Sequence, residues 1–487
     1  MRSKKIIKSL MILLFVSIPV ILSACADAED SIEEEDGVTT ITFMSRWPEI
    51  NSLLTEELIP EFEEEHPDIK VKQVSYSSHG NYVKALQSAV NGDDLPDFFA
   101  NHPKMPTYQL QSLGLLHELD DIIGDKKDDF EEGMWTQAST TMDDKIYSFP
   151  IFSNKKDTIL MYYNKDVLEE AGLTEDDIPE TWDELVDVSE QIRDKTDAYG
   201  TYLELNYWTI EFLVNEMAST ITPEVVSTLE NTNIDYKEGE YNYNTEGTKE
   251  TIKFLASLVE DGLDEPSDIS RSEAQGPGVL SAGKAAFLFS GGFASVEMDE
   301  EGFEDYGVAP IPTKDGEKKQ AQYSGAVQSG GFHVAKDTEN YEEVKMFFEF
   351  LMDRGYTAMV EEGVGYPPIP AIEDEADNPD TPSWDALTQQ NHEYELYPDA
   401  VMNNEDAYKV KEEMSGKGTD QNVGDVARGY IKGQIKEGEL EDELQKMTDK
   451  QNEAFKEAIK NVQDDGVDID QSDWVFPDWE PGEPYDK

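Results

Sequence analysis

Aromatic and polar residues that could bind a polyhydroxylated ligand recur where the sequence predicts that strands end. Arg46 and Trp47 follow one predicted strand, Tyr76 follows a second, and Asn101 with His102 follows a third. A sugar presents C–H bonds on its faces and hydroxyl groups at its edge. Its site therefore needs flat aromatic rings and a few convergent polar groups. These five residues are candidates for saccharide contacts.

Later in the chain, further aromatic rings and paired glycines lie in predicted turns. A glycine has no side chain to block a ligand from the backbone N–H groups. Each of these residues also has a plain structural interpretation, as core, rim or tight turn. Arg46 is likewise either a solvated surface residue or a planar fork of donors for hydroxyl or carboxylate groups. The further candidates are Trp208, Gly291, Gly292, Phe293, Gly330, Gly331 and Tyr366.

Two patterns that imitate other sites are better explained as ordinary structure. Residues 278–284 have the spacing of a phosphate-binding loop, but Ala285 stands where a Mg²⁺-binding hydroxyl is needed, so a helix is expected. Tyr162 and Tyr163 are adjacent, like the tyrosines of ferric-ion receptors. In an apolar run they are more simply strand residues that face opposite ways.

No metal or cofactor is expected. Asp464, Asp468, Asp470 and Asp473 suggest Ca²⁺, but the glycine required at the sixth loop position is missing. The six histidines show no ligand spacing.

The segment from residue 40 to residue 100 alternates strand, helix, strand, helix and strand. This order predicts an α/β fold with a doubly wound sheet, in which ligands bind at the carboxyl ends of the strands. The candidates Trp47, Tyr76, Asn101 and His102 all fall at such ends.

The composition is strongly acidic. The 487 residues include 106 Asp and Glu but 39 Lys and Arg, which gives a formal net charge of −67. A solvated carboxylate coat is the simple explanation. No basic patch with interleaved aromatics is visible, so nucleic acid is not an expected partner. The negative charge disfavours strongly anionic ligands as well. A sugar that contains uronic acid stays a possible ligand, because Arg46, Lys155 and Lys156 could bind its carboxylate.

The N-terminus has the order of a lipoprotein signal. Basic residues precede an apolar run from Leu10 to Leu22, and small residues then lead to Cys25, the only cysteine. We expect cleavage after residue 24, lipid on Cys25, an acidic tether over residues 25–36, and a position on the extracytoplasmic face of the cell membrane. The alternative is a plain signal peptide with a coincidental cysteine.

Residues 146–185 carry a resemblance to a known family. Their sequence contains YSFP, then LMYYNKDVLEEAGL, then PETWDEL with Pro179, Thr181, Trp182 and Leu185. This resembles the family 1 extracellular solute-binding proteins, the sugar-type receptors of ATP-driven importers. Residues 283–293 are similar to that family's glycine-rich segment, and residues 306–312 resemble its return crossover. The resemblance covers most of residues 38–370.

The resemblance implies a two-lobed periplasmic-binding-protein-like fold of type II, joined by hinge crossovers. One lobe would contain residues 37–152 and 312–355, and the other residues 153–311 and 356–463. Residues 464–487 would form an acidic, aromatic strap. The ligand cleft would flank the first crossover, which adds Phe152, Ser153 and Asn154 to the candidates. Trp182, at the start of an amphipathic helix, is expected to be packing.

The function that follows is capture of a saccharide, expected to be an oligosaccharide, and its delivery to the permease of an ABC transporter. The protein would be a monomer and would catalyse no reaction. Two alternatives stay open at this point. They are a lipid-anchored glycosidase that uses two carboxylates and a ferric-ion receptor on the same fold.

Overall fold

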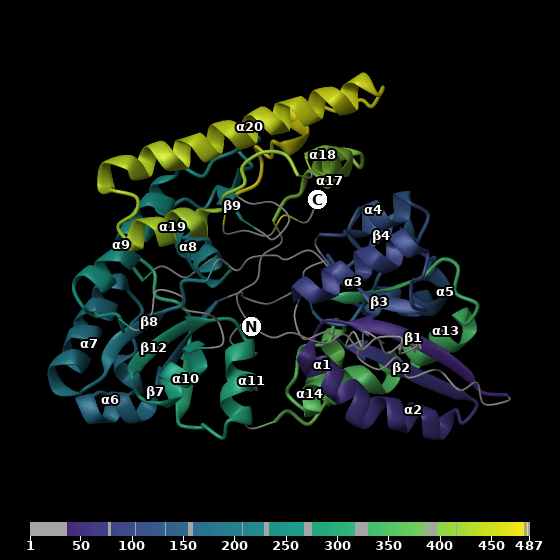
Figure 1. Ribbon diagram of the computed structural model, residues 1–487, viewed down its shortest axis with the longest axis horizontal. Coiled ribbons are helices and arrows are strands. Elements are labelled where there is room, and N and C mark those ends of the chain that lie inside the picture. The colour runs from purple at the N-terminus through teal and green to yellow at the C-terminus, as the bar shows by residue number, and fades with distance from the viewer. Residues whose placement is uncertain are drawn as a thin grey trace, which may run out of the picture. The chain divides into compact units, whose positions relative to one another are not determined.

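The computed structural model describes most of the chain after residue 36. The ranges are 37–75, 79–102, 104–131, 133–153, 159–206, 208–227, 233–266, 275–316, 330–379, 381–382, 384–385, 388, 397–414, 416–481 and 485. The predicted signal peptide, Cys25 and the tether lie outside these ranges, as do Tyr76 and Asn154. Residues Thr39–Lys487 form one compact unit, which contains two large sheets (Figure 1).

The first sheet has five strands in the order β2-β1-β3-β14-β6. β1 pairs in parallel with β2 and β3, as the alternation of strands and helices predicts, whereas β14 is antiparallel to β3 and β6. Its centre is aromatic: the ring of Phe43 stacks on Phe98 at 4.8 Å, and Phe332 meets both edge-on. The strand bounds are β1 Thr39–Ser45, β2 Ile69–Ser75, β3 Phe98–Ala100, β6 Phe149–Pro150 and β14 Gly331–Val334.

The second sheet has four strands in the order β13-β7-β12-β8. β12 is parallel to β8 and antiparallel to β7, which in turn is antiparallel to β13. β12 is buried along its whole length, which fits its apolar sequence AAFLFS. The bounds are β7 Leu160–Asn164, β8 Tyr199–Leu203, β12 Ala285–Ser290 and β13 Tyr306–Ala309.

Two small sheets complete the strands. β9 (Val225–Val226), β10 (Ile234–Asp235) and β11 (Glu240–Tyr241) form one, and β4 (Thr141–Met142) pairs with β5 (Lys145–Ile146) in the other.

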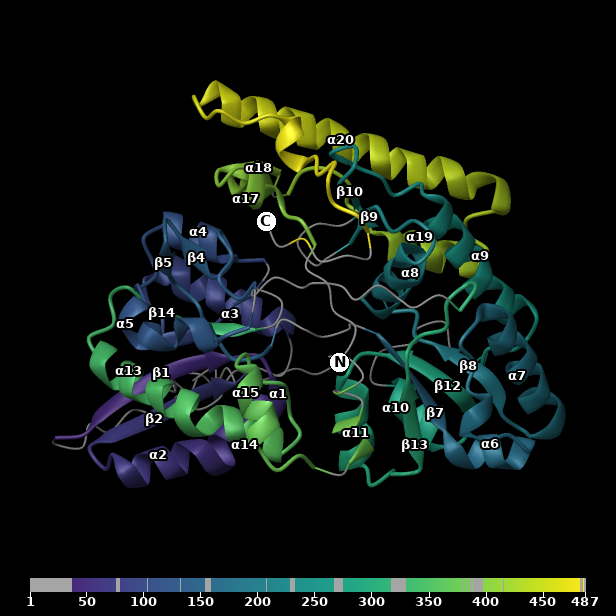
Figure 2. The same ribbon diagram turned by 180° about the vertical axis from the view of Figure 1, so that it is seen from behind.

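Helices connect and cover the strands. In the first half they are α1 Pro48–Leu53, α2 Ile59–Glu65, α3 His79–Gly92, α4 Thr107–Ser112, α5 Asp120–Ile123, α6 Lys165–Ala171, α7 Trp182–Lys195, α8 Thr209–Ser219, α9 Glu246–Glu260, α10 Gly276–Ser281 and α11 Phe293–Glu300. After them come α13 Tyr341–Phe350, α14 Tyr356–Glu361, α15 Pro370–Glu375, α17 Ala400–Asn403, α18 Ala407–Met414, α19 Val423–Ile431 and α20 Leu440–Asp464. α20 contacts both α18 and α19 (Figures 1 and 2).

Several local predictions are confirmed. Trp182 is packing, as expected, because it stacks on Phe254 and its indole N–H donates to Pro312 O. Thr181 and Glu184 form a capping box at the start of α7. The first four residues of the imitation phosphate loop belong to α10, which spans Gly276–Ser281. Tyr162 and Tyr163 belong to different hydrophobic clusters, as residues on opposite faces of a strand should.

The apolar residues from 423 to 462 predict helix, and the structure has two helices there, α19 and α20. Gly433 adopts a φ of +68° and its N–H bonds to Tyr430 O, which ends α19 in the way glycine usually does.

α14 packs with the first sheet, although the sequence places residues 356 onward in the other lobe. It contacts α1, and Tyr356 donates its hydroxyl proton to Pro150 O over 2.6 Å. The ring of Tyr356 also stacks on Phe149.

The aromatic residues after α20 are buried. Trp474, Phe476 and Trp479 are each at most 2% exposed, and Phe476 N–H bonds to Tyr236 O at 2.8 Å. Asp470 and Asp473, considered above as calcium ligands, instead cap the short 3₁₀ turn at Gln471–Trp474.

Two features are absent from the described residues. None of their helices has the length and apolarity to cross a bilayer, and no three His, Cys, Asp or Glu side chains among them are grouped to hold a metal ion.

His333 is a fully buried histidine within β14. Its Nδ1–H donates to Tyr147 O at 2.8 Å, and its Nε2 has no partner among the described residues. Burial lowers the pKa of His333 to about 4, because a charged ring would leave an N–H unsolvated.

We predict that this histidine destabilises the fold in mild acid. Unfolding restores its ordinary pKa, so the unfolded state binds the extra proton and stability falls from about pH 6.5 to pH 4. The full loss is on the order of 3 kcal/mol. Urea unfolding across this pH range checks it: His333→Gln should show a smaller loss than the wild type, and equal losses would contradict the prediction.

Candidate functional site

The strand directions bring several candidate residues to one edge of the first sheet. The carboxyl ends of β1, β3 and β6 meet there, together with the amino end of β14, because Phe332 is paired with Ala100 and Gly331 with Pro150. This edge carries the sequence candidates Arg46, Trp47, Asn101, His102, Phe152, Ser153, Gly330 and Gly331.

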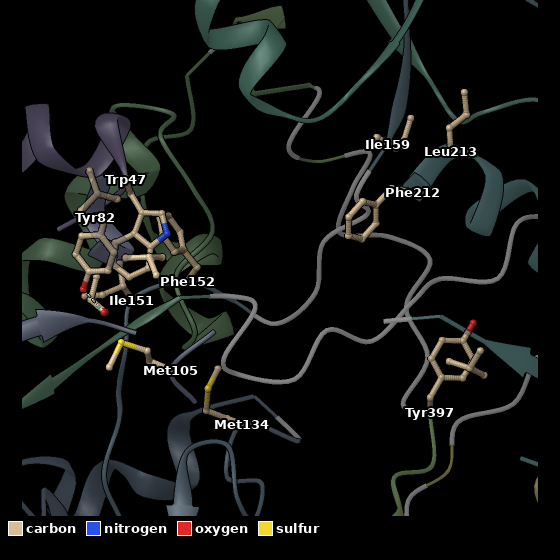
Figure 3. Packing of buried hydrophobic residues seen from close by; sticks show 14 of the residues in the cluster. Trp47, Tyr82, Met105, Met134, Ile151, Phe152, Ile159, Phe212, Leu213 and Tyr397 are labelled. Atoms are coloured by element: carbon tan, nitrogen blue, oxygen red, sulfur yellow. Dashed lines mark hydrogen bonds between the residues drawn. The ribbon is translucent and has the colours of Figure 1, made fainter. Parts of the chain in front are cut away.

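Trp47 and Phe152 form the aromatic centre of this edge. Their ring centroids are 5.6 Å apart and nearly perpendicular, and Figure 3 shows the two side chains together. Gly330 has a φ of +99°, and a Cβ there would lie 2.7 Å from Trp47 Cζ2 and 2.8 Å from Phe152 Cδ2. Only glycine fits, both for its backbone and for its neighbours.

Arg46 covers part of the Trp47 ring. Its guanidinium carbon lies 4.7 Å from the ring centroid, and its Nε donates to Asn101 O at 2.7 Å. The arginine is thus tied to the end of β3 as well as to β1. A ligand that stacks on this face of Trp47 has to displace the guanidinium or share the ring with it.

Asn101 and His102 are buried rather than open. Asn101 is 1% exposed and its N–H bonds to Gly331 O, whereas His102 is 8% exposed and its Nδ1 accepts from Lys104 N–H. The His102 ring stacks on Tyr82, with ring centroids 6.2 Å apart and 25° between the ring planes.

Ser153 and Tyr366 join the first crossover to a distant segment. Ser153 N–H donates to Tyr366 O at 2.8 Å, and the Ser153 hydroxyl donates to the Glu131 carboxylate at 2.7 Å. The Tyr366 ring itself packs on Trp384, at 4.9 Å, so its backbone rather than its ring reaches the crossover.

A second group lies at the corresponding edge of the other sheet. Here β8 and β12 end, and β7 begins. Trp208 is half-buried at the start of α8, 4.8 Å from Phe212. Gly291 O accepts a hydrogen bond from the Tyr162 hydroxyl, and Gly292 is the N-cap of α11, which begins at Phe293.

Two buried carboxylates at this second edge were missed by the sequence analysis. Glu204 is 1% exposed and accepts from the hydroxyls of Ser290 and Thr209. Glu216 is fully buried and accepts from Ile159 N–H at 3.2 Å, which ties α8 to the start of β7. In a chain with 106 acidic residues, the sequence around Glu216 does not distinguish it from the others. Glu204 could have been recognised only from its position directly after β8.

Comparison with known proteins defines the family. The profile described as bacterial extracellular solute-binding protein matches residues 47–358, so the chain belongs to that family. It is similar to the multiple sugar-binding protein of Streptococcus mutans, with 29% identity over 39% of this chain and 42% of that one. The arabinooligosaccharide-binding protein of Bacillus subtilis is 24% identical over 70% and 74%. The chain spans about half the length of several other curated relatives that it matches, such as 58% of a binding protein of Brucella abortus.

Solved structures confirm the two-lobed α/β fold. The GacH receptor of Streptomyces glaucescens, described unliganded and with acarbose, has a TM-score of 0.66 at 18% identity, over 86% of this chain and 99% of that one. RafE in complex with raffinose has a TM-score of 0.61 at 17% identity, over 86% and 100%.

We predict that Gly330→Ala damages the first edge. The new methyl group would overlap Trp47 and Phe152 at a positive φ, and the expected cost is roughly 2 kcal/mol of unfolding free energy. Urea unfolding measures it. Gly278→Ala is the matched control, since residue 278 is an exposed helix position with no neighbour within 4 Å of the added Cβ. Equal stability of the two variants would contradict the close contact.

Proposed function

We propose that this protein is a lipid-anchored receptor that binds a saccharide and delivers it to the permease of an ABC transporter. The observation that carries the proposal is the cluster at the edge of the first sheet, where Trp47 and Phe152 meet the backbone of Gly330 and Arg46 lies over the Trp47 ring. Rings and polar groups held at strand ends suit the faces and hydroxyls of a sugar.

The ligand class is supported by the names of relatives and structural neighbours. Two arabinooligosaccharide-binding proteins are among the relatives, and the neighbours include complexes with raffinose and cycloalternan. An oligosaccharide is therefore the proposed ligand. It would contact Trp47 and Arg46 at one sheet edge and Trp208 with Gly291 and Gly292 at the other.

The proposal includes no catalytic step. Glu131, Glu204 and Glu216 are buried carboxylates at the two sheet edges, and each accepts hydrogen bonds from donors of the chain itself. They fit a role in holding the site together. The proposed position of the protein is the extracytoplasmic face of the membrane, with the lipid on Cys25, and it is proposed to act as a monomer.

Ligand screening tests the proposal. Thermal shift should be measured with arabino-, xylo- and chito-oligosaccharides and with raffinose, and the bound sugar should then be recovered and weighed by mass spectrometry. We expect stabilisation by at least one sugar and its recovery intact. Recovery of shortened sugars would mean that the protein is a glycosidase and not a receptor. A visible tyrosinate–iron absorption band on adding Fe³⁺ would favour the ferric-ion receptor.

We predict that Trp47→Ala and Trp208→Ala each weaken saccharide binding by about 1 kcal/mol or more, because an aromatic face is lost. Calorimetric titration measures the affinity, and urea unfolding should accompany it because Trp47 is 93% buried by its neighbours. Tyr199→Ala is the control: Tyr199 begins β8, at the far end of that strand from Trp208. If both tryptophan variants bind the sugar with wild-type affinity, the two sheet edges are not the saccharide-binding site.

A further inference from the structure

A polar pocket lies beside α8, on residues that the proposed saccharide site does not use. Its volume is about 500 Å³, and its lining includes Glu211, Lys417, Thr419, Asp420, Asn422 and Asp425. Glu211 stands in the first turn of α8, three residues after Trp208, whose carbonyl accepts from Phe212 N–H in the same turn. The pocket wall and the candidate tryptophan therefore share one helical turn.

α19 is attached to this turn through Glu211. The Asn422 side-chain amide donates to the Glu211 carboxylate at 2.6 Å, while Asn422 also caps α19 by accepting from Asp425 N–H. Gly424 lies against the Glu211 backbone so closely that a Cβ there would be 2.9 Å from Glu211 N. The first turns of the two helices are in direct contact, with a single carboxyl group bonded across them.

The surroundings of Glu211 make the contact between α8 and α19 depend on whether this carboxyl group is protonated. Burial is the main cause that raises the pKa of Glu211 to about 7, the negative charge of Asp425 adds to it, and the Asn422 bond opposes it. Near neutral pH the Glu211 side chain therefore exists both as a neutral acid and as a carboxylate. The carboxylate form lies beside the Asp425 side chain.

The other ionisable groups near Glu211 are engaged elsewhere. Arg428 of α19 pairs with Asp425, Lys417 with Glu413, and Asp420 with Lys450 of α20. On the packed α9, Lys249 pairs with Glu246, and Glu250 with Lys314. Within α8 itself, Glu216 accepts from Ile159 N–H. The remaining titratable groups of α8, α9 and α19 are Lys253, Glu260 and Tyr430, and Tyr243 also lines the pocket.

We propose that Glu211 is a pH-sensitive positioning residue: its neutral form holds α19 against the first turn of α8, and its ionisation loosens this contact and displaces Trp208. The proposal rests on the proposed function for its effect on binding. Saccharide affinity should then be higher in mildly acidic medium than in alkaline medium.

The direct experiment needs no ligand. Urea unfolding and tryptophan fluorescence, with Trp208→Phe to identify the Trp208 signal, are recorded from about pH 5 to pH 8.5. Because the folded state holds a proton that the unfolded state releases more easily, the wild type should lose stability relative to Glu211→Gln as the pH rises. The Trp208 signal should change with a midpoint near neutrality in the wild type, and should stay constant in Glu211→Gln.

Two further variants locate the cause. Asp425→Asn removes the neighbouring charge and should move the fluorescence midpoint down by about one pH unit. Glu453→Gln removes one charge from an exposed position of α20 and is the control, which should titrate like the wild type. A stability difference between wild type and Glu211→Gln that does not vary with pH would overturn the proposal. A Trp208 signal indifferent to pH would also overturn it.

The binding arm uses whichever sugar gives the largest thermal shift in the screen. Its affinity for the wild type should fall about threefold or more between about pH 6 and pH 8.5, and should change less for Glu211→Gln. An equal fall in both proteins would overturn the link to binding. If no sugar binds, the proposed function fails. The fluorescence experiment still shows whether ionisation of Glu211 loosens the contact between α8 and α19.

Discussion

The ring of Phe152 lies against the backbones of two glycines, Gly330 and Gly365, that are remote from it in the sequence. A Cβ at Gly330 would be 2.8 Å from this ring, and one at Gly365 would also be 2.8 Å from it. The neighbouring backbones are bonded as well, since Ile151 N–H donates to Gly330 O and Ser153 N–H to Tyr366 O. Three passes of the chain therefore meet at one aromatic side chain. The position of Trp47, which packs on the same ring, depends on that meeting.

Carboxylates inside the protein hold together segments that strands alone would not join. Asp97 accepts from Thr42 in β1 and from Thr338 and Asn340 before α13. Glu216 binds the start of β7, and Glu204 binds the end of β12. Each of these acids receives several donors or a backbone N–H, which offsets the cost of its burial. The acidic residues thus have two roles: most form a solvated surface, and a few buried ones join distant segments through hydrogen bonds.

The sequence predicts the first sheet and its edge because that information is local. Alternating strands and helices require a doubly wound sheet, and residues after strand ends then fall at one edge, as Arg46, Asn101 and His102 do. The internal carboxylates and Gly365 were not found, because their partners are remote in sequence and their residue types are common. Tyr366 shows the same limit: its backbone reaches the crossover, but its ring belongs to a separate small cluster.

The buried aromatic residues after α20 impose an order on the way the protein folds. Trp479 O accepts from Lys237 across 242 residues of sequence, and Phe476 packs on Tyr236 beside it. Contacts between such distant residues form slowly, because a long loop must close before they stabilise anything. The ring of Tyr236 therefore gains its neighbours Phe476 and Trp479 only after the last part of the chain has been synthesised. Until then these contacts are unmade, and a chaperone or protease can reach this part of the newly made chain.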